Sequence, residues 1–464
     1  MVRKMMSRPA FGKTEAAVIL ILLCFVVVRS FYSVPTFSDE NIYINMAKAV
    51  NNGLVPYHDF FYAHPPLQLY LFQPVLSVFG ENFFAVKAFM TLISSLCALF
   101  VFLIVRRMFG EKAAVAALVL FILFPGFIIF SNQATGMLEA LSFFLAGFYL
   151  LLRKNTFLSS IFFCLAIFTR YLYILMIPMI LLFIWEFDRG LMKRLVAYLA
   201  ADVAIIASFF VAIFGPAMLR DTVIYHFQAN ISVKAGIAMW ISQYLVFGFF
   251  TIFISAICIA YGVWKKDRLI LLLAAYPLAY DLLVLLIFKA VIYHYFLASV
   301  AFIFIAAGGV ASKSGNLMRI SIAIIALTAL VTNAQGILLY SMPSQNQAFT
   351  ELANYARENV SSGEFIFGEP RTTDYVSFAT GARIAGNNFD TDSKAVNFAG
   401  EDRFFANVTA FKPEMLLIDG NFNYLDRFGR SYIFVKEWNV PGYMDVSLYR
   451  RAPDNVSAFM NLSA

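Results

Sequence analysis

Charged residues are scarce in this chain. They make up 14% of its 464 residues, whereas hydrophobic residues make up 61%. Soluble domains carry about 25% charged residues, and apolar runs of about 20 residues are typical of membrane-spanning helices. The composition therefore excludes an ordinary soluble protein and predicts a polytopic α-helical membrane protein.

Cysteine is equally scarce. The four cysteines, Cys24, Cys97, Cys164 and Cys258, all lie inside apolar runs. Their spacing fits neither a zinc site nor an outer disulfide framework, so we interpret them as packing residues. The basic N-terminal segment is followed by no small-residue cleavage site, so we expect the first apolar run to be retained as a span. The chain also has no internal repeat and no low-complexity tract.

The apolar runs predict about eleven transmembrane helices. The expected spans are 16–31, 83–105, 113–130, 136–152, 157–168, 172–185, 195–214, 241–263, 269–288, 291–310 and 317–339. The fifth and sixth runs are short. Treating them as two helices keeps the basic loops, among them Arg106-Arg107 and Lys193-Arg194, on the side of the N-terminus. The positive-inside rule then places the N-terminus inside and the C-terminus outside.

The formal net charge of +7 does not indicate a nucleic-acid partner, because the positive residues fall mostly in these short loops. We expect an integral membrane protein in contact with lipid, with its active site on the extracytoplasmic side. The N-glycosylation sequons all fall on that predicted side.

Composition divides the chain into two predicted domains. Residues 1–340 form the transmembrane module, and 341–464 form a small α/β domain on the outer face, because this part is mixed in polarity and lacks a membrane-length run. Its amphipathic stretch predicts a helix over 345–359. The expected strands are Glu364–Phe367, Met415–Ile418, Tyr432–Val435 and Val446–Tyr449.

The first outer loop, residues 35–81, carries the most informative pattern. Asp39 and Glu40 come just after the first span, and His64-Pro65-Pro66-Leu67 closes the segment. Ionisable groups at a membrane rim are costly if unpaired and are therefore often functional. We expect interfacial helices at Asn41–Val50 and from Pro66 to Phe79, which would hold these groups at the mouth of the bundle.

This order of motifs resembles the protein O-mannosyltransferase and aminoarabinose transferase group of the GT-C glycosyltransferases. The resemblance implies a sugar donor carried on a polyprenyl phosphate, dolichyl or undecaprenyl, and it implies that Asp39 is the catalytic base with Glu40 beside it. Further matches are Glu139 near the start of the fourth span, Arg170 in AIFTRY, and Lys289 with Tyr293-His294-Tyr295. The inserted outer domain of eukaryotic O-mannosyltransferases and the WWDYG-type motif of oligosaccharyltransferases are missing.

The expected reaction moves a single hexosyl or pentosyl group to a hydroxyl of a glycan, lipid or protein. A single-displacement, inverting route needs one carboxylate base, and Asp39 is our candidate. The acid pair has a simpler interpretation, in which Asp39 or Glu40 caps the following helix. No metal is obligatory, although His58, Asp59 and His64 with Asp39 would allow a divalent ion.

The leaving phosphate needs positive or hydrogen-bonding partners. The candidate substrate-binding residues are His64, Glu139, Arg170, Lys289, Tyr293 and His294. Four of these have a structural alternative: Arg170 and Lys289 can snorkel from helix ends, His64 can fix the loop, and His294 can be a packed core histidine. We interpret Lys87 as a snorkelling residue, and Glu139 as paired with Arg170 or facing a cavity. Tyr43, Tyr57 and Tyr62 can stack on a sugar, and the sequence does not choose among them.

Two rival functions remain open. One is a transporter or flippase of lipid-linked sugars, although such carriers often contain repeats and this chain shows none. The other is a non-catalytic assembly protein that binds glycolipid.

Asp390-Thr-Asp392 mimics the acidic motif of nucleotide-sugar enzymes, and we interpret it as a solvated turn.

Overall fold

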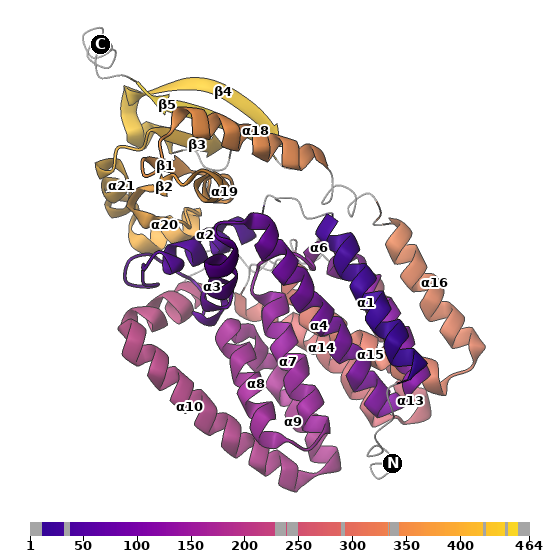
Figure 1. Cartoon of the computed structure of the whole chain (residues 1–464). Helices are drawn as coiled ribbons and strands as arrows, with labels where there is room; N and C mark the ends of the chain where they lie inside the picture. Colours follow the sequence, from indigo (N-terminus) through magenta and orange to yellow (C-terminus); the bar gives the residue numbers. More distant parts are fainter. Residues whose placement is uncertain are drawn as a thin grey trace.

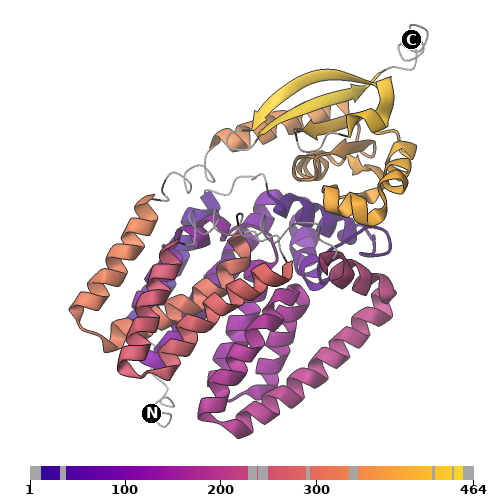
Figure 2. The same ribbon diagram turned by 180° about the vertical axis from the view of Figure 1, so that it is seen from behind.

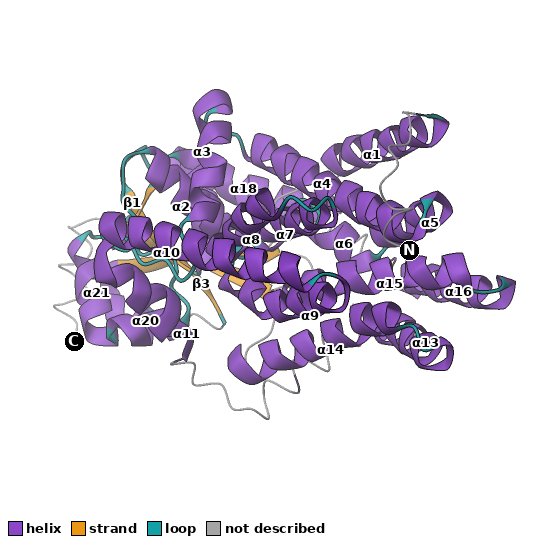
Figure 3. Cartoon of the chain, turned by 90° about the horizontal axis from the view of Figure 1, so that it is seen from below, coloured by secondary structure: helices purple, strands orange, loops and turns teal. Residues whose placement is uncertain are grey.

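The structure is a computed structural model that describes residues 12–31, 38–227, 238, 249–288, 293–332, 334, 343–420, 424–440 and 444–452. Figure 1 shows a bundle of long helices with a mixed helix-and-strand unit over one end, which is the end opposite the N-terminus. Seen from below, the strands are confined to that unit (Figure 3).

The bundle is built from the part of the chain before residue 333. Its longer elements are α1 (Lys13–Phe31), α4 (Phe83–Phe109), α5 (Glu111–Ile122), α7 (Met137–Leu152), α8 (Thr156–Thr169), α9 (Ile177–Phe187), α10 (Arg189–Leu219), α13 (Phe249–Lys265), α14 (Arg268–Phe288), α15 (Leu297–Lys313) and α16 (Asn316–Thr332). Among the described residues, four helices are long and apolar enough to cross a membrane: Phe83–Phe109, Arg189–Phe227, Arg268–Ile287 and His294–Lys313. Each expected span overlaps at least one helix, and the number of membrane crossings remains a prediction.

Two expected spans are interrupted. The run 113–130 is α5 followed by the short α6 (Pro125–Phe130), because proline lacks an N–H group and favours a helix start. Between α8 and the 3-10 helix η2 (Tyr171–Met176), Arg170 has extended backbone with φ −148° and ψ 115°. The fifth and sixth runs are therefore separate elements, as the charge pattern predicts.

Helix α10 is longer than its apolar run. It begins at Arg189, where the Asp188 side chain accepts a bond from the Leu191 amide at 2.9 Å. Gly215 turns the chain with φ 67°, a value that favours glycine, and Pro216 follows it. The π-helical turn η3 (Arg220–Ile224) and α11 (Tyr225–Phe227) continue from there towards the outer unit. Figures 1 and 2 show α10 crossing the outside of the bundle.

The two expected loop helices are present as α2 (Glu40–Asn51) and α3 (Leu67–Phe79). The sequence predicted that α2 lies along the membrane surface, yet nearly its whole length is buried. The polar residues of α2 are covered by a helix of the outer unit, α19 (Pro370–Thr380), with which α2 makes many contacts. The apolar pattern correctly identified the helix and could not reveal what covers it.

The outer unit contains a five-stranded sheet in the order β2-β1-β3-β5-β4. Its elements are α18 (Pro343–Asn359), β1 (Phe365–Gly368), α19, β2 (Arg383–Ile384), the 3-10 helix η6 (Ala385–Asn387), α20 (Ser393–Ala399), α21 (Glu401–Ala410), β3 (Met415–Asp419), the 3-10 helix η7 (Leu425–Ser431), β4 (Tyr432–Val440) and β5 (Met444–Arg451). β1 pairs in parallel with β2 and β3, while β5 is antiparallel to β3 and β4. The helix and the four strands expected from the sequence are all found.

The sheet is covered on both faces. Ile366 and Leu417 belong to the core that is continuous with the bundle, whereas their neighbours Phe367 and Leu416 pack with Val408 of α21. This alternation follows from the two-residue period of a strand. The face towards α18 and α19 thus joins the outer unit to the rest of the core.

Candidate active site

A buried loop between α6 and α7, residues 131–136, forms the centre of the candidate site. The Ala134 amide donates a hydrogen bond to Glu40 Oε2 at 3.3 Å. The Thr135 carbonyl accepts one from the guanidinium of Arg170. The loop therefore connects the start of α2 with the end of α8 inside the protein.

Glu40 is held in a buried ion pair. Lys87 Nζ lies 2.6 Å from Glu40 Oε1 and 2.8 Å from Oε2, and both side chains have 0% exposure. The buried Arg29 also interacts electrostatically with Glu40. The interpretation of Lys87 as a snorkelling residue is wrong, because its ammonium group points into the core. Close geometry of this kind is what offsets the desolvation of two charges.

Asp39 lies in a different environment from its neighbour. It occupies the N-cap position of α2, but its side chain makes no capping bond, so the capping alternative for Asp39 is wrong. Oδ1 accepts a bond from Arg371 Nε at 3.0 Å, and the Asp39 side chain is 24% exposed. No described residue donates a hydrogen bond to Oδ2, so this oxygen differs from Oδ1 in lacking a partner there.

A row of polar contacts fixes α19 along α2. Asn41 Nδ2 donates to the Arg371 carbonyl at 2.9 Å, Asn45 Nδ2 donates to Asp374 Oδ1 at 2.7 Å, and Lys48 Nζ donates to the Ser377 carbonyl at 3.2 Å. Both helices contribute residues three or four positions apart, so each contact uses one face of its helix. The outer unit therefore places Arg371 on Asp39.

Arg170 is buried at the end of α8, with 3% exposure. One nitrogen, Nη2, donates to the Thr135 carbonyl, and the guanidinium lies over the Tyr43 ring at 4.9 Å. Nε and Nη1 are buried and have no hydrogen-bond partner among the described residues. The snorkelling alternative for Arg170 is wrong, since the side chain points inwards.

Gly136 makes room for this guanidinium. Its φ is +78°, and a Cβ at this position would stand 2.3 Å from Arg170 Nε and 2.7 Å from Gln68 Oε1. Gln68 is itself held by Tyr62 Oη, which donates to Oε1 at 3.0 Å. The packing around Arg170 therefore requires glycine both for conformation and for space.

Glu139 is close to Arg170 without pairing with it. It is fully buried in the first turn of α7, and Oε1 accepts a bond from the Gly136 amide at 3.2 Å. Oε2 has no hydrogen-bond partner, and no ion pair joins Glu139 to Arg170 within the described part of the chain. Their charges nevertheless interact, so the sequence correctly places Glu139 near Arg170.

His64 belongs to a half-buried aromatic cluster. Its Nε2 lies 2.9 Å from Tyr43 Oη, and its ring stacks on His226 at 5.4 Å. Burial, followed by the charge of Arg170, holds the pKa of His64 well below its usual value. His64 is therefore uncharged near neutral pH and acts as a hydrogen-bonding group.

Tyr57 and Tyr62 are buried, which leaves neither ring exposed for stacking on a sugar.

The last group of candidate residues is only partly described. Lys289 lies outside the described residues, and the structure describes the backbone of Tyr293 but not its side chain. His294 is 7% exposed, and its ring lies 5.8 Å from that of Phe130. Its charge interacts with those of Asp39 and Arg170, which places His294 near both residues.

The acidic turn at Asp390 faces this region. Asp390 Oδ1 accepts a bond from the Asp392 amide at 3.2 Å, so the turn expected from the sequence is present. Burial and the neighbouring Asp392 raise the pKa of Asp390 to about 8, and Asp39 contributes to this shift. The turn is not fully solvated as the sequence suggested, because Asp390 is half-buried beside the candidate site.

Metal binding remains a prediction. In the described ranges, no group of three or more His, Cys, Asp and Glu side chains is placed to hold a metal ion. His58 Nδ1 lies 2.8 Å from Asp59 Oδ1 with 81% exposure, whereas His64 is turned inwards. These residues and Asp39 therefore do not form the ligand set considered from the sequence.

Sequence reasoning missed two contributors. Arg371 follows Asp39 by 332 positions, and its segment carries no motif that marks it as a partner. The loop 131–136 reads as an ordinary polar connector, yet it is buried and bonds to both Glu40 and Arg170. The available signal for this loop was Gly136 just before α7, because a glycine there permits close approach of other side chains to the backbone.

Part of the chain matches a known protein family. Residues 63–214 match the family model described as dolichyl-phosphate-mannose-protein mannosyltransferase. None of the curated proteins matches the sequence significantly.

Solved structures share the fold across most of the chain. ArnT from Cupriavidus metallidurans bound to undecaprenyl phosphate is 12% identical, with a TM-score of 0.67 over 96% of this chain and 99% of its own. Its apo state is 13% identical, with a TM-score of 0.64 over 94% and 98%. The archaeal oligosaccharyltransferase AglB from Archaeoglobus fulgidus, in complex with an inhibitory peptide and a dolichol-phosphate, is 14% identical, with a TM-score of 0.54 over 87% and 69%. These matches confirm the predicted resemblance to the GT-C glycosyltransferases. The mostly helical architecture of this chain matches that of the ArnT structures.

Proposed function

We propose that this protein is a membrane glycosyltransferase that moves a single sugar from a polyprenyl-phosphate carrier to a hydroxyl acceptor on the extracytoplasmic face. The observation that carries the proposal is the buried guanidinium of Arg170, in which Nε and Nη1 have no hydrogen-bond partner in the described part of the chain. An unpaired buried charge is costly, and such a group is retained where a ligand completes it.

A phosphate is the anion that fits Arg170. A guanidinium presents its N–H donors in a planar fork that matches phosphate oxygens and gives charge-assisted bonds. His64 and His294 both interact electrostatically with Arg170, and each can donate a further hydrogen bond. Two structural relatives were solved with a polyprenyl or dolichyl phosphate, which supports the same class of donor here.

Asp39 is the proposed general base. Its Oδ2 takes the proton of the acceptor hydroxyl while the hydroxyl oxygen attacks the anomeric carbon. The bond between that carbon and the phosphate oxygen breaks, and its electron pair leaves with the polyprenyl phosphate, whose charge Arg170 stabilises. Attack from the face opposite the phosphate inverts the anomeric centre. Arg371 fixes the other carboxylate oxygen and so orients the base.

A binding experiment tests the donor site. Undecaprenyl phosphate is titrated onto the full chain in nanodiscs, and binding is measured by native mass spectrometry. Charge-assisted bonds contribute about 1.5–3 kcal/mol each, so Arg170→Met is expected to weaken binding about 10-fold to 100-fold. Arg194→Met is the matched control, since Arg194 is an exposed arginine of α10. Equal binding by both variants would remove the phosphate role of Arg170.

A transfer experiment tests the base and separates the enzyme from a flippase. The gene is deleted, complemented with variants, and the surface glycans are analysed by mass spectrometry. Asp39→Asn is expected to reduce transfer at least about 100-fold while undecaprenyl phosphate still binds. Asp426→Asn, an exposed acid in η7, serves as the control. Normal glycans in the Asp39→Asn strain would contradict the assignment.

A further inference from the structure

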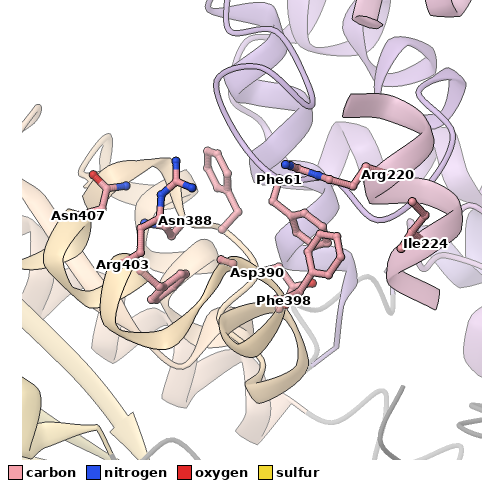
Figure 4. Close-up of a pocket in the computed structure, with 12 residues that line it drawn as sticks. Phe61, Arg220, Ile224, Asn388, Asp390, Phe398, Arg403 and Asn407 are labelled. Carbon is pink, nitrogen blue, oxygen red and sulfur yellow. The ribbon is translucent and has the colours of Figure 1, made fainter. Parts of the chain in front are cut away.

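A large pocket lies where the outer unit meets the bundle. Its volume is about 740 Å³, within the range of roughly 300–1,000 Å³ that is typical of ligand sites. The residues used below are Phe61, Arg220, Asn388, Asp390, Phe398 and Arg403. Figure 4 shows Phe61 and Arg220 on the bundle side of the gap, with Asn388 and Arg403 on the outer unit.

The apolar side of the pocket is a group of aromatic rings. The rings of Phe61 and Phe398 lie 5.8 Å apart, and each packs against Tyr225, at 4.9 Å and 5.4 Å. The Arg220 guanidinium lies over the Phe398 ring at 5.7 Å. Aromatic surfaces of this kind offer flat apolar faces beside polar groups.

The polar side offers donors and acceptors from the outer unit. Arg403 is exposed and forms no ion pair with another described residue. The amides of Asn388 and Asn407 gather over Gly386, where a Cβ would stand 2.6 Å and 2.7 Å from their nitrogens. Asp390 adds a carboxyl group to the pocket lining, and its charge interacts with that of Asp39.

We propose that this pocket binds the acceptor and that the acceptor is a glycan. The proposal rests on the glycosyltransferase function proposed above. Sugar rings present apolar faces that pack on aromatic side chains, while their hydroxyl groups pair with amides, guanidinium and carboxyl groups. The pocket combines these groups, and one of them, Asp390, interacts electrostatically with the proposed base. The lipid-linked donor comes from the membrane, so a pocket walled by the outer unit suits the water-soluble reactant.

The pocket suits a glycan better than a peptide. Proteins commonly bind extended peptides along a sheet edge or in a helix-sized apolar groove. Here the outer wall comes from α20, α21 and the turn before them, so it offers side chains and no strand edge. A peptide acceptor is therefore the competing outcome of the experiment.

The experiment measures direct binding to the full chain in nanodiscs. The probes are fluorescently labelled glycans released from the surface of the gene-deletion strain and, in a second arm, labelled tryptic peptides of its surface proteins. Arg403→Met and Phe398→Leu are each expected to weaken glycan binding by about 10-fold, the size of one strong contact. Arg450→Met, an exposed arginine on β5, is the matched control and leaves binding unchanged.

Undecaprenyl phosphate binding is measured on the same samples, so a misfolded variant is recognised by its loss. Glycan binding that is unchanged in both pocket variants would overturn the proposal, and so would binding of peptides alone or of neither probe. Those results leave the donor site standing if Arg170→Met still loses undecaprenyl phosphate. Loss of glycan binding with normal donor binding is the expected result.

Discussion

The buried pair between Glu40 and Lys87 gives the sharpest prediction about stability. Both side chains have 0% exposure, so water does not screen their charges. Removing one partner of a buried ion pair costs about 3–5 kcal/mol, whereas replacing both partners is often neutral. We therefore expect Glu40→Gln and Lys87→Met to destabilise the protein singly and the double variant to recover most of the loss.

The surroundings set the order of the two single variants. Arg29 interacts with Glu40, so the carboxylate keeps part of its charge compensation in Lys87→Met. We expect this variant to lose about 3 kcal/mol of unfolding free energy. Glu40→Gln leaves two buried cations without their shared anion, so we expect it to lose about 5 kcal/mol of unfolding free energy. Melting temperatures in one detergent measure the ranking. Arg268→Met, which breaks an exposed pair with Glu186, is the control and costs less than about 1 kcal/mol.

The same double variant decides the role of Glu40. If the pair is structural, the double variant is stable and still transfers sugar. A double variant as unstable as the worse single variant would refute the pairwise reasoning. Recovered stability with lost transfer would instead assign Glu40 to catalysis, as the sequence predicts.

Three further predictions follow from the site. Gly136→Ala is expected to weaken undecaprenyl phosphate binding, because its Cβ would stand 2.3 Å from Arg170 Nε. Gly363→Ala is the control and should bind normally, since Gly363 has φ +93° but open space around it. Equal binding by the two variants would contradict the packing argument. Arg371→Met is expected to lower kcat roughly 2-fold to 10-fold with normal donor binding, since it removes one partly exposed bond to Asp39, and kinetics with the isolated acceptor measure this. Because the pKa of Asp390 is raised to about 8, the stability it contributes is fully present below its ordinary pKa and is lost as pH rises through about 8; melting curves between about pH 6 and 9 should fall less steeply for Asp390→Asn.

The helices could be predicted from the sequence because their signal is local. Apolar length located the elements of the bundle, and the period of Asn41–Val50 located α2. The two-residue strand β2 carries too few residues for any pattern. Helix α20 could not be predicted for the same reason, because it has only seven residues.

The candidate site was predictable only in part. Asp39, His64, Glu139 and Arg170 could be identified because they stand in recognisable motifs. In the structure, the charge of Arg170 interacts with those of His64 and Glu139, and Asp39 and Arg170 both interact with His294. The pairing of Glu40 with Lys87 and of Asp39 with Arg371 could not be read, since each joins segments far apart in the chain. Such contacts depend on tertiary packing, which leaves no local trace in a single sequence.

The most direct measurement of the central claim is a cryo-electron microscopy structure of the full chain in nanodiscs with undecaprenyl phosphate. We expect the phosphate within hydrogen-bond distance of Arg170 Nε and Nη1. A phosphate bound elsewhere, with these two nitrogens still lacking an acceptor, would contradict the account.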